Sequence, residues 1–146
     1  MERLTAFEQA AREVIADRGA GVFKHDRREV LDLRDIEGVH RMRVATRRLR
    51  AALEVFAPAL DRRRGKDALR GVKALAEALG ERRDRDVQLE SLAALQSETF
   101  GAERRAVDIL AAELRAEQQR ANADLAKALR RARRERLERR LERLTR

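Results

Sequence analysis

The sequence predicts an all-α protein, a helical bundle of about four to five helices that ends in a long C-terminal helix. Aromatic residues make up only 3% of the chain, with no Trp, no Tyr and a single Pro, whereas a β-sandwich or barrel needs many aromatic and β-branched residues. Charged residues reach 42%, but Ala and Leu are also abundant, which is typical of long amphipathic helices. We therefore expect residues 1–146 to form one helical domain.

The first half of the chain predicts two helices joined by a less regular segment. Apolar residues at helical spacing between Leu4 and Ile15 predict a first helix that ends at Gly19–Gly21, a C-cap and turn. Residues 22–34 are less periodic, so a short helical piece and a packed connector are both open there. A second helix is predicted over about residues 36–57, because Asp35 is a good N-cap and Pro58 closes the run.

The second half predicts three more helices, separated by glycine and polar residues. A third helix runs from about Arg62 to Leu79 with Gly80 as its stop, and a fourth runs over about residues 83–96 before a break at Ser97–Gly101. From Ala102 onward a leucine stripe continues for about 40 residues, or about 60 Å of helix. Such a helix outreaches a compact bundle.

The end of this last helix, residues 130–146, is strongly basic, with nine Arg and three Glu. Its leucines, Leu137, Leu141 and Leu144, extend the stripe beyond the expected core. Two interpretations are open: the overhang pairs with another chain, or it frays as a basic tail. Self-association is the favoured one, so we expect a homodimer.

Charge and composition restrict the partners. The net charge is +9 and 31 of the 35 basic residues are Arg, which favours an anionic, phosphate-bearing partner, although a GC-rich genome also raises the Arg content. With no Cys, disulfides and thiolate sites are excluded, and a reducing cytoplasm fits. The start has no apolar leader and no stretch is long enough to span a bilayer, so no membrane association is expected.

The most informative segment is the run from Val39 to Leu53, VHRMRVATRRLRAAL, which holds five Arg and no acid. At about 100° per residue, four side chains fall within an arc of about 80° along about 15 Å of helix: His40, Arg43, Arg47 and Arg50. Arg48 lies beside this arc. Like charges at this spacing repel one another, and a linear polyanion would offset the repulsion. The alternative is a solvated face balanced by Glu54 and acids of neighbouring helices.

The next predicted helix repeats the pattern. Lys66, Arg70 and Lys73 fall within about 60° of arc, so two antiparallel helices could border one basic groove. Further on, Asp84 and Asp86 alternate with arginines. These acids either cap a helix start or hold a neighbouring Arg in the rotamer that binds a ligand.

The string Val39–Leu53 closely resembles the signature of the CHAD family, α-helical domains named for a characteristic histidine. A second similar element follows in Val72–Leu75, Leu79–Gly80 and Arg83–Val87, so the resemblance covers about residues 35–95. CHAD domains are helical bundles that bind inorganic polyphosphate and often occur with triphosphate-processing domains or at polyphosphate granules. The resemblance therefore implies a polyphosphate-binding module, with these phosphate contacts: His40, Arg43, Arg47, Arg48, Arg50, Lys73 and Arg83.

The chain departs from the family pattern in length. The typical domain is about twice as long and has a related basic helix in its second half, yet no second His-x-x-Arg motif follows residue 100 here. The chain thus resembles the N-terminal half of a full-length domain. Either a half-domain dimerises to rebuild a basic channel, or the missing half weakens or abolishes binding.

An enzyme is disfavoured by the residues. Glu37 and His40 have the Glu-x-x-His spacing of di-metal bundles, but no second pair follows and Arg43 would repel a dication. Around Lys66, Leu60 stands where a phosphate-cradling loop needs its leading Gly. We expect no catalytic residue, no metal and no cofactor.

Two further function classes stay open as alternatives. Phosphate contacts alone would give non-specific binding of DNA or RNA, although base stacking lacks aromatic residues. A coiled-coil structural adaptor would instead use the stripe from Leu110 to Leu144. The favoured interpretation is a non-catalytic polyphosphate binder.

Overall fold

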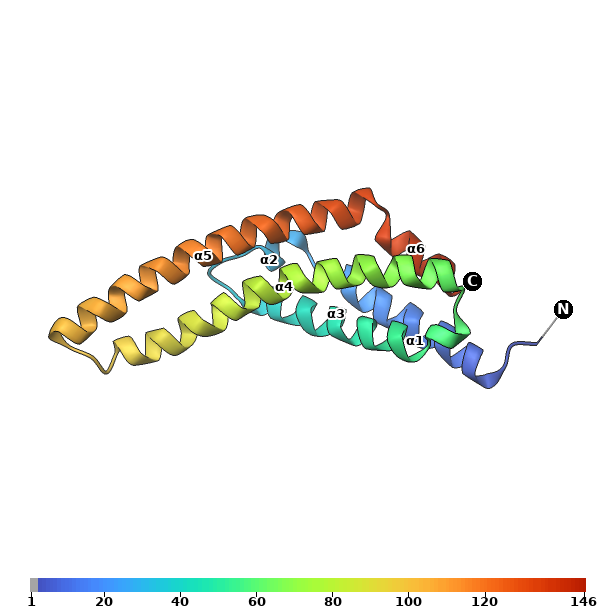
Figure 1. The fold of residues 1–146 in the computed structure, drawn as a ribbon, viewed down its shortest axis with the longest axis horizontal. Helices are drawn as coiled ribbons and strands as arrows, with labels where there is room; N and C mark the ends of the chain where they lie inside the picture. Colours follow the sequence, from blue (N-terminus) through green and yellow to red (C-terminus); the bar gives the residue numbers. More distant parts are fainter. Residues whose placement is uncertain (1–2) are drawn as a thin grey trace.

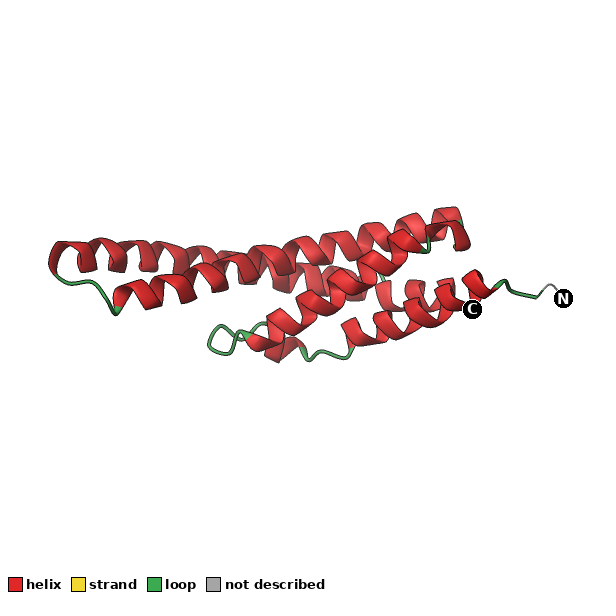
Figure 2. Cartoon of the chain, turned by 90° about the horizontal axis from the view of Figure 1, so that it is seen from below, coloured by secondary structure: helices red, strands yellow, loops and turns green. Residues whose placement is uncertain are grey.

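The computed structural model describes residues 3–146, which form helices and no strand, as the composition predicts. A long hairpin of α4 and α5 forms one side of the molecule, α3 and α6 pack against part of its length, and α1 packs on α3 and α6 (Figures 1 and 2). The elements in order are α1 (Ala6–Phe23), α2 (Arg27–Val30), α3 (Glu37–Val55), the 3-10 turn η1 (Ala57–Ala59), α4 (Arg62–Gln96), α5 (Gly101–Arg134) and α6 (Leu137–Leu144).

Helix α1 begins with a reciprocal capping box. The Glu8 amide donates to Thr5 Oγ1 at 3.1 Å, and the Thr5 amide donates to Glu8 Oε2 at 2.8 Å. The prediction that the helix ends at Gly19–Gly21 is wrong, because α1 continues to Phe23. Gly19 and Gly21 keep negative φ angles, and continuing the helix buries Val22 in the core.

The segment left open in the sequence contains the short helix α2, capped by Asp26. The following helix, α3, lies within two residues of its predicted bounds. Its N-cap is Ile36 rather than Asp35, and Asp35 Oδ1 instead accepts from the Glu37 amide at 3.0 Å. After α3, Pro58 lies in η1, which turns the chain into α4.

The predicted third and fourth helices are one continuous helix of 35 residues, α4. Gly80 does not stop it, because Leu79 and Arg82 on either side are fully buried and their packing offsets the roughly 1 kcal/mol that a mid-helix glycine costs. Asp84 and Asp86 therefore lie inside a helix. The interpretation that they cap a helix start is wrong.

The C-terminal segment also differs from its prediction. The break after Gln96 is confirmed, but α5 ends at Arg134, and Arg136 takes a left-handed conformation with φ of 55° before α6 turns back. Leu137, Leu141 and Leu144 are buried in the same core as α1 and α4, so the segment neither overhangs nor frays. The stripe that favoured a homodimer is used inside the chain.

The part that projects from the bundle is the other end of the hairpin. We call residues 84–119, the end of α4 and the start of α5, the arm; its tip extends beyond the remaining helices (Figure 1). The rest of the chain is called the body, and it holds almost all of the core cluster. None of the helices in residues 3–146 combines the length and apolar composition needed to cross a bilayer.

Candidate functional site

The predicted basic helix, α3, packs between α1 and α4 and buries its apolar side, including Met42, Leu49 and Leu53. Helical periodicity then divides its cationic side chains between two flanks. Arg43 lies toward α4, and Arg48 lies toward α1. The charged face therefore spreads across three helices.

On the α4 flank, Arg43 lies against Gly80. A Cβ at Gly80 would be 4.0 Å from Arg43 Nε, so the glycine leaves room for the guanidinium. Because α3 and α4 run antiparallel on either side of η1 and pack against each other, Arg43 and Gly80 lie on facing flanks of the two helices. The basic groove between the two helices stays a prediction.

On the α1 flank, a hollow of about 480 Å³ opens between α1 and α3. His40 and Arg48 of α3 line this hollow, and Asp17 is its one acid. Basic residues of α1 and of the loop that follows it complete the lining: Arg18, Lys24 and His25. His25, which the sequence analysis did not single out, thus lines this hollow. Burial and the charges of Lys24 and Arg41 lower its pKa, against a smaller opposing effect of Glu29.

Most of the predicted cations have no acidic partner. Arg50 pairs with Glu54 at 3.2 Å and Arg70 with Asp67 at 3.8 Å. Across residues 3–146, no carboxylate lies within 4.0 Å of the charged nitrogens of the other predicted residues: His40, Arg43, Arg47, Arg48, Lys66, Lys73 and Arg83. Balancing by Glu54, as in the alternative interpretation, applies to Arg50, whereas Arg47 and Arg48 are exposed and unpaired.

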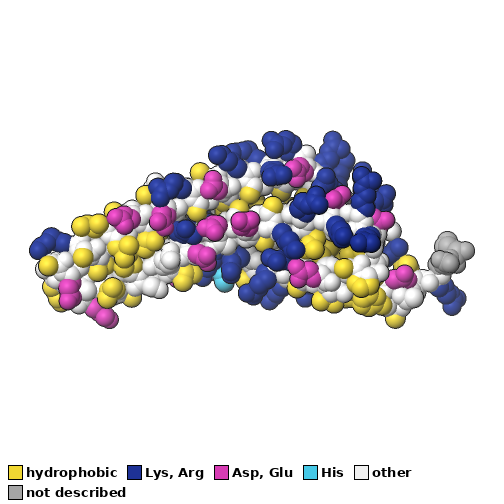
Figure 3. Space-filling model, in the orientation of Figure 1, with side chains coloured by type: hydrophobic (Ala, Val, Ile, Leu, Met, Phe, Trp, Pro, Cys, Tyr) yellow, Lys and Arg dark blue, Asp and Glu magenta, His cyan; other side chains and the backbone are white. Residues whose placement is uncertain are grey.

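Two buried nitrogens of this face lack a hydrogen-bond partner in the described chain, His40 Nδ1 and Arg83 Nη1. Leaving a buried polar group unpaired costs roughly 1–3 kcal/mol. His40 lines the hollow on the α1 flank, and Arg83 lies on α4. In the view of Figure 3, Lys and Arg side chains are concentrated over the body, mainly where α4, α5 and α6 lie in Figure 1, and apolar side chains are prominent on the arm.

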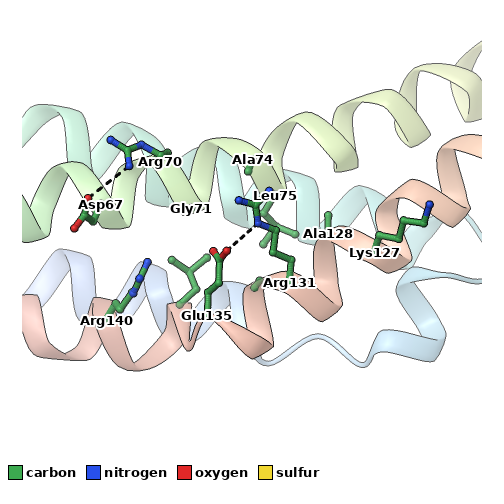
Figure 4. A pocket seen from close by; sticks show the side chains of 12 residues that line it. Asp67, Arg70, Gly71, Ala74, Leu75, Lys127, Ala128, Arg131, Glu135 and Arg140 are labelled. Carbon is green, nitrogen blue, oxygen red and sulfur yellow. Dashed lines mark hydrogen bonds and ion pairs between the residues drawn. The ribbon is translucent and has the colours of Figure 1, made fainter.

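The structure separates Arg70 from the predicted groove. Arg70 lies on the opposite flank of α4, where it lines a pocket of about 600 Å³ between α4, α5 and α6 (Figure 4). Lys66 and Lys73 are exposed on the outer surface of α4 between the two flanks. The 60° arc that grouped the three residues was thus wide enough to place them beside different helices.

Sequence reasoning missed the other cations of this second pocket, Lys127, Arg131 and Arg140. Arg131 Nε is held by Glu135 Oε1 at 2.9 Å, and this bond lowers the pKa of Glu135 and raises that of Arg131. Lys127 and Arg131 are four residues apart, which was a usable signal. Arg131 and Arg140 lie within residues 130–146, which were predicted to overhang, and Lys127 comes just before that segment.

A buried ion pair fixes the start of α3. Arg82 Nε donates to Asp86 Oδ1 at 2.9 Å, and its other nitrogens donate to the carbonyls of Val30 and Asp32 at 3.2 and 2.8 Å. From α5, Asn122 accepts from Arg82 at 2.8 Å and donates to the Leu31 carbonyl at 3.0 Å. Asp86 does hold a neighbouring Arg, but Arg82 is fully buried and positions the connector before His40 instead of contacting a ligand.

The comparison with protein-family models decides the relationship. The model described as the CHAD domain matches residues 13–146, nearly the whole chain. The chain belongs to the CHAD domain family. The comparison with curated proteins gave no match, and neither did the comparison with solved structures.

The match extends the CHAD assignment well beyond the basic segments of α3 and α4, because it includes α5 and α6. Residues 3–146 contain no group of three or more His, Asp or Glu side chains placed to hold a metal ion. The chemistry available on this CHAD surface is cationic: guanidinium, ammonium and imidazole groups on a face formed by α1, α3 and α4.

Proposed function

We propose that this CHAD protein is a non-catalytic module that binds inorganic polyphosphate along the face of α3. The observation that carries the proposal is the row of unpaired cations, Arg43, Arg47 and Arg48, together with the unpaired Lys73 and Arg83 on the neighbouring helix α4. Arg binds phosphate oxygens through two parallel hydrogen bonds, and a linear polyanion neutralises several side chains in succession. Family membership supports the same ligand.

The first test compares long-chain polyphosphate with length-matched single-stranded DNA at near-physiological salt, where the Debye length is about 8 Å and diffuse attraction is screened. A shaped phosphate site predicts clear preference for polyphosphate. Equal and weak binding of both polyanions would contradict the proposal and favour a non-specific nucleic-acid binder.

The second test removes two unpaired arginines, in the variant Arg43→Ala/Arg47→Ala. We expect at least a tenfold loss of polyphosphate affinity, since a charge-assisted hydrogen bond contributes about 1.5–3 kcal/mol. Isothermal titration measures the affinity, and circular dichroism checks that the helix content is unchanged.

The matched control is Arg105→Ala/Arg120→Ala, which removes the same charge from exposed positions of α5. It should retain most of the affinity. Equal losses in the two variants would show that only the general field of the protein attracts polyphosphate. A coiled-coil adaptor would leave both variants indistinguishable from the unmodified chain.

The proposal extends to partners and place. It includes a homodimer, a triphosphate-processing enzyme as a partner, and a cytoplasmic location at polyphosphate granules. Since the C-terminal leucines are buried within the chain, a homodimer needs a surface other than the one predicted from sequence.

A further inference from the structure

The arm tip combines an exposed aromatic residue with weak local structure. Phe100 is 82% exposed, and three further apolar residues of the arm, Leu95, Ile109 and Leu110, are 46%, 63% and 46% exposed. Phe100 also occupies the N-cap of α5, where it offers no side-chain hydrogen bond, although Ser, Thr, Asp and Asn are the residues that stabilise this position. A residue that satisfies neither burial nor capping indicates an interaction surface.

The charge of the arm has the opposite sign to that of the body. Residues 84–119 contain eight Asp and Glu against four Arg, a net charge of −4, which leaves +13 on the rest of the chain. At the tip, Glu98 and Glu103 flank Phe100 on either side. The tip is therefore an aromatic side chain between two carboxylates.

The body carries a cavity with the complementary properties. It has a volume of about 600 Å³, and its floor is formed by core residues such as Val30, Met42 and Leu75. Its rim carries one acid, Glu138, and five arginines: Arg27, Arg130, Arg133, Arg136 and Arg139. An apolar floor with a cationic rim fits an apolar side chain flanked by carboxylates.

We propose that a second copy of this chain docks its arm tip into this cavity, with Phe100 on the apolar floor and Glu98 and Glu103 against the arginine rim. An exposed aromatic side chain entering a pocket is a typical energetic centre of a protein interface. Contact between two arms is disfavoured, because each carries −4. This head-to-tail contact is independent of polyphosphate binding, and either proposal can fail alone.

The first test is Phe100→Ser, measured by sedimentation equilibrium of the full chain over a range of concentrations. Self-association should weaken at least tenfold, the effect of losing an interface anchor. The same variant should raise the urea midpoint, because Ser is a good N-cap, so a lost assembly cannot be attributed to unfolding. The matched control Val55→Ser, at a 64% exposed apolar residue of α3, should leave assembly unchanged.

The second test uses complementary variants. Arg130→Glu/Arg133→Glu should fail to self-associate, as should Phe100→Ser, but their mixture should form a 1:1 pair, because one keeps its tip and the other its cavity. Rising salt should weaken the pair. A monomeric wild-type chain at millimolar concentration, an assembled Phe100→Ser or an assembled arginine variant would each overturn the proposal, the last by indicating contact between arms.

Discussion

Arg82 is the only fully buried arginine among residues 3–146, and its guanidinium donates four hydrogen bonds at the junction of α2, α4 and α5. Its partners are 40 to 52 residues distant along the chain, apart from Asp86. A single side chain thus ties the connector between α2 and α3 to the long hairpin. The position of His40 depends on it.

Replacing Arg82 should be strongly destabilising. Arg82→Met leaves the Asp86 carboxylate buried without a cation, and we expect a loss of about 3–5 kcal/mol in the free energy of unfolding, measured by urea titration. Arg82→Met/Asp86→Leu removes the buried charge as well and should lose less. A double variant that is as unstable as the single one would show that the backbone carbonyls, not Asp86, need the arginine.

His25 makes the stability of the free protein depend on pH. Its pKa in the folded chain is lowered from 6.5, so the unfolded chain takes up the proton first as the pH falls. We expect the free energy of unfolding to have its full value above about pH 6.5 and to decrease as the pH falls below it. Urea titrations at successive pH values measure this dependence.

His25→Asn should flatten this decrease, and an unchanged profile would assign the proton uptake to other groups. The affinity for polyphosphate should depend on pH in the opposite direction. A polyanion in the hollow lined by Lys24, His25 and Arg41 favours the imidazolium form of His25, so polyphosphate affinity should rise as the pH falls through the same range.

At the scale of elements, glycines have different effects according to what faces them. At Gly80 of α4, an added Cβ would meet only Arg43 Nε, at an ordinary contact distance of 4.0 Å. Gly38, in the first turn of α3, lies so close to α2 that an added Cβ would be 2.4 Å from the Glu29 carbonyl oxygen. The first site tolerates a methyl group and the second excludes it.

Gly80→Ala should therefore raise the free energy of unfolding by about 0.5–1 kcal/mol through higher helix propensity, with polyphosphate affinity retained. Gly38→Ala is the contrasting variant and should be destabilising. Urea titration checks both. If Gly80→Ala is destabilising instead, Arg43 cannot adjust to the methyl group, and polyphosphate affinity should then fall with stability.

Helix content, the bounds of α3 and its cationic side could be predicted because they depend on local periodicity. The ends of α1 and α4 could not, since Gly19, Gly21 and Gly80 are potential stops whose effect is set by the burial of Val22, Leu79 and Arg82. The return of α6 depends on one left-handed residue, Arg136, which has no sequence signal. Tertiary packing also decides which helix each side chain faces. Helical spacing alone therefore assigned Arg70 to the predicted groove and did not identify His25 and Lys127 as residues that line pockets.

At the scale of the whole molecule, phosphate binding and self-association are assigned to adjoining surfaces. The proposed polyphosphate face is formed by α1, α3 and α4, whereas the rim of the proposed docking cavity lies mainly on α2, α5 and α6, and His25 lines both sites. The arm tip is remote from both on its own chain (Figure 1).

The opposite charges of arm and body also give the molecule a large electric dipole along its length. A polyanion approaching in solution attracts the body and repels the arm, so the field orients the protein before contact and speeds productive encounters. Proteins captured in this way would line a phosphate chain with their arms directed outward. Each bound protein would then present its aromatic tip to the surroundings, and polyphosphate would become the scaffold on which further copies collect.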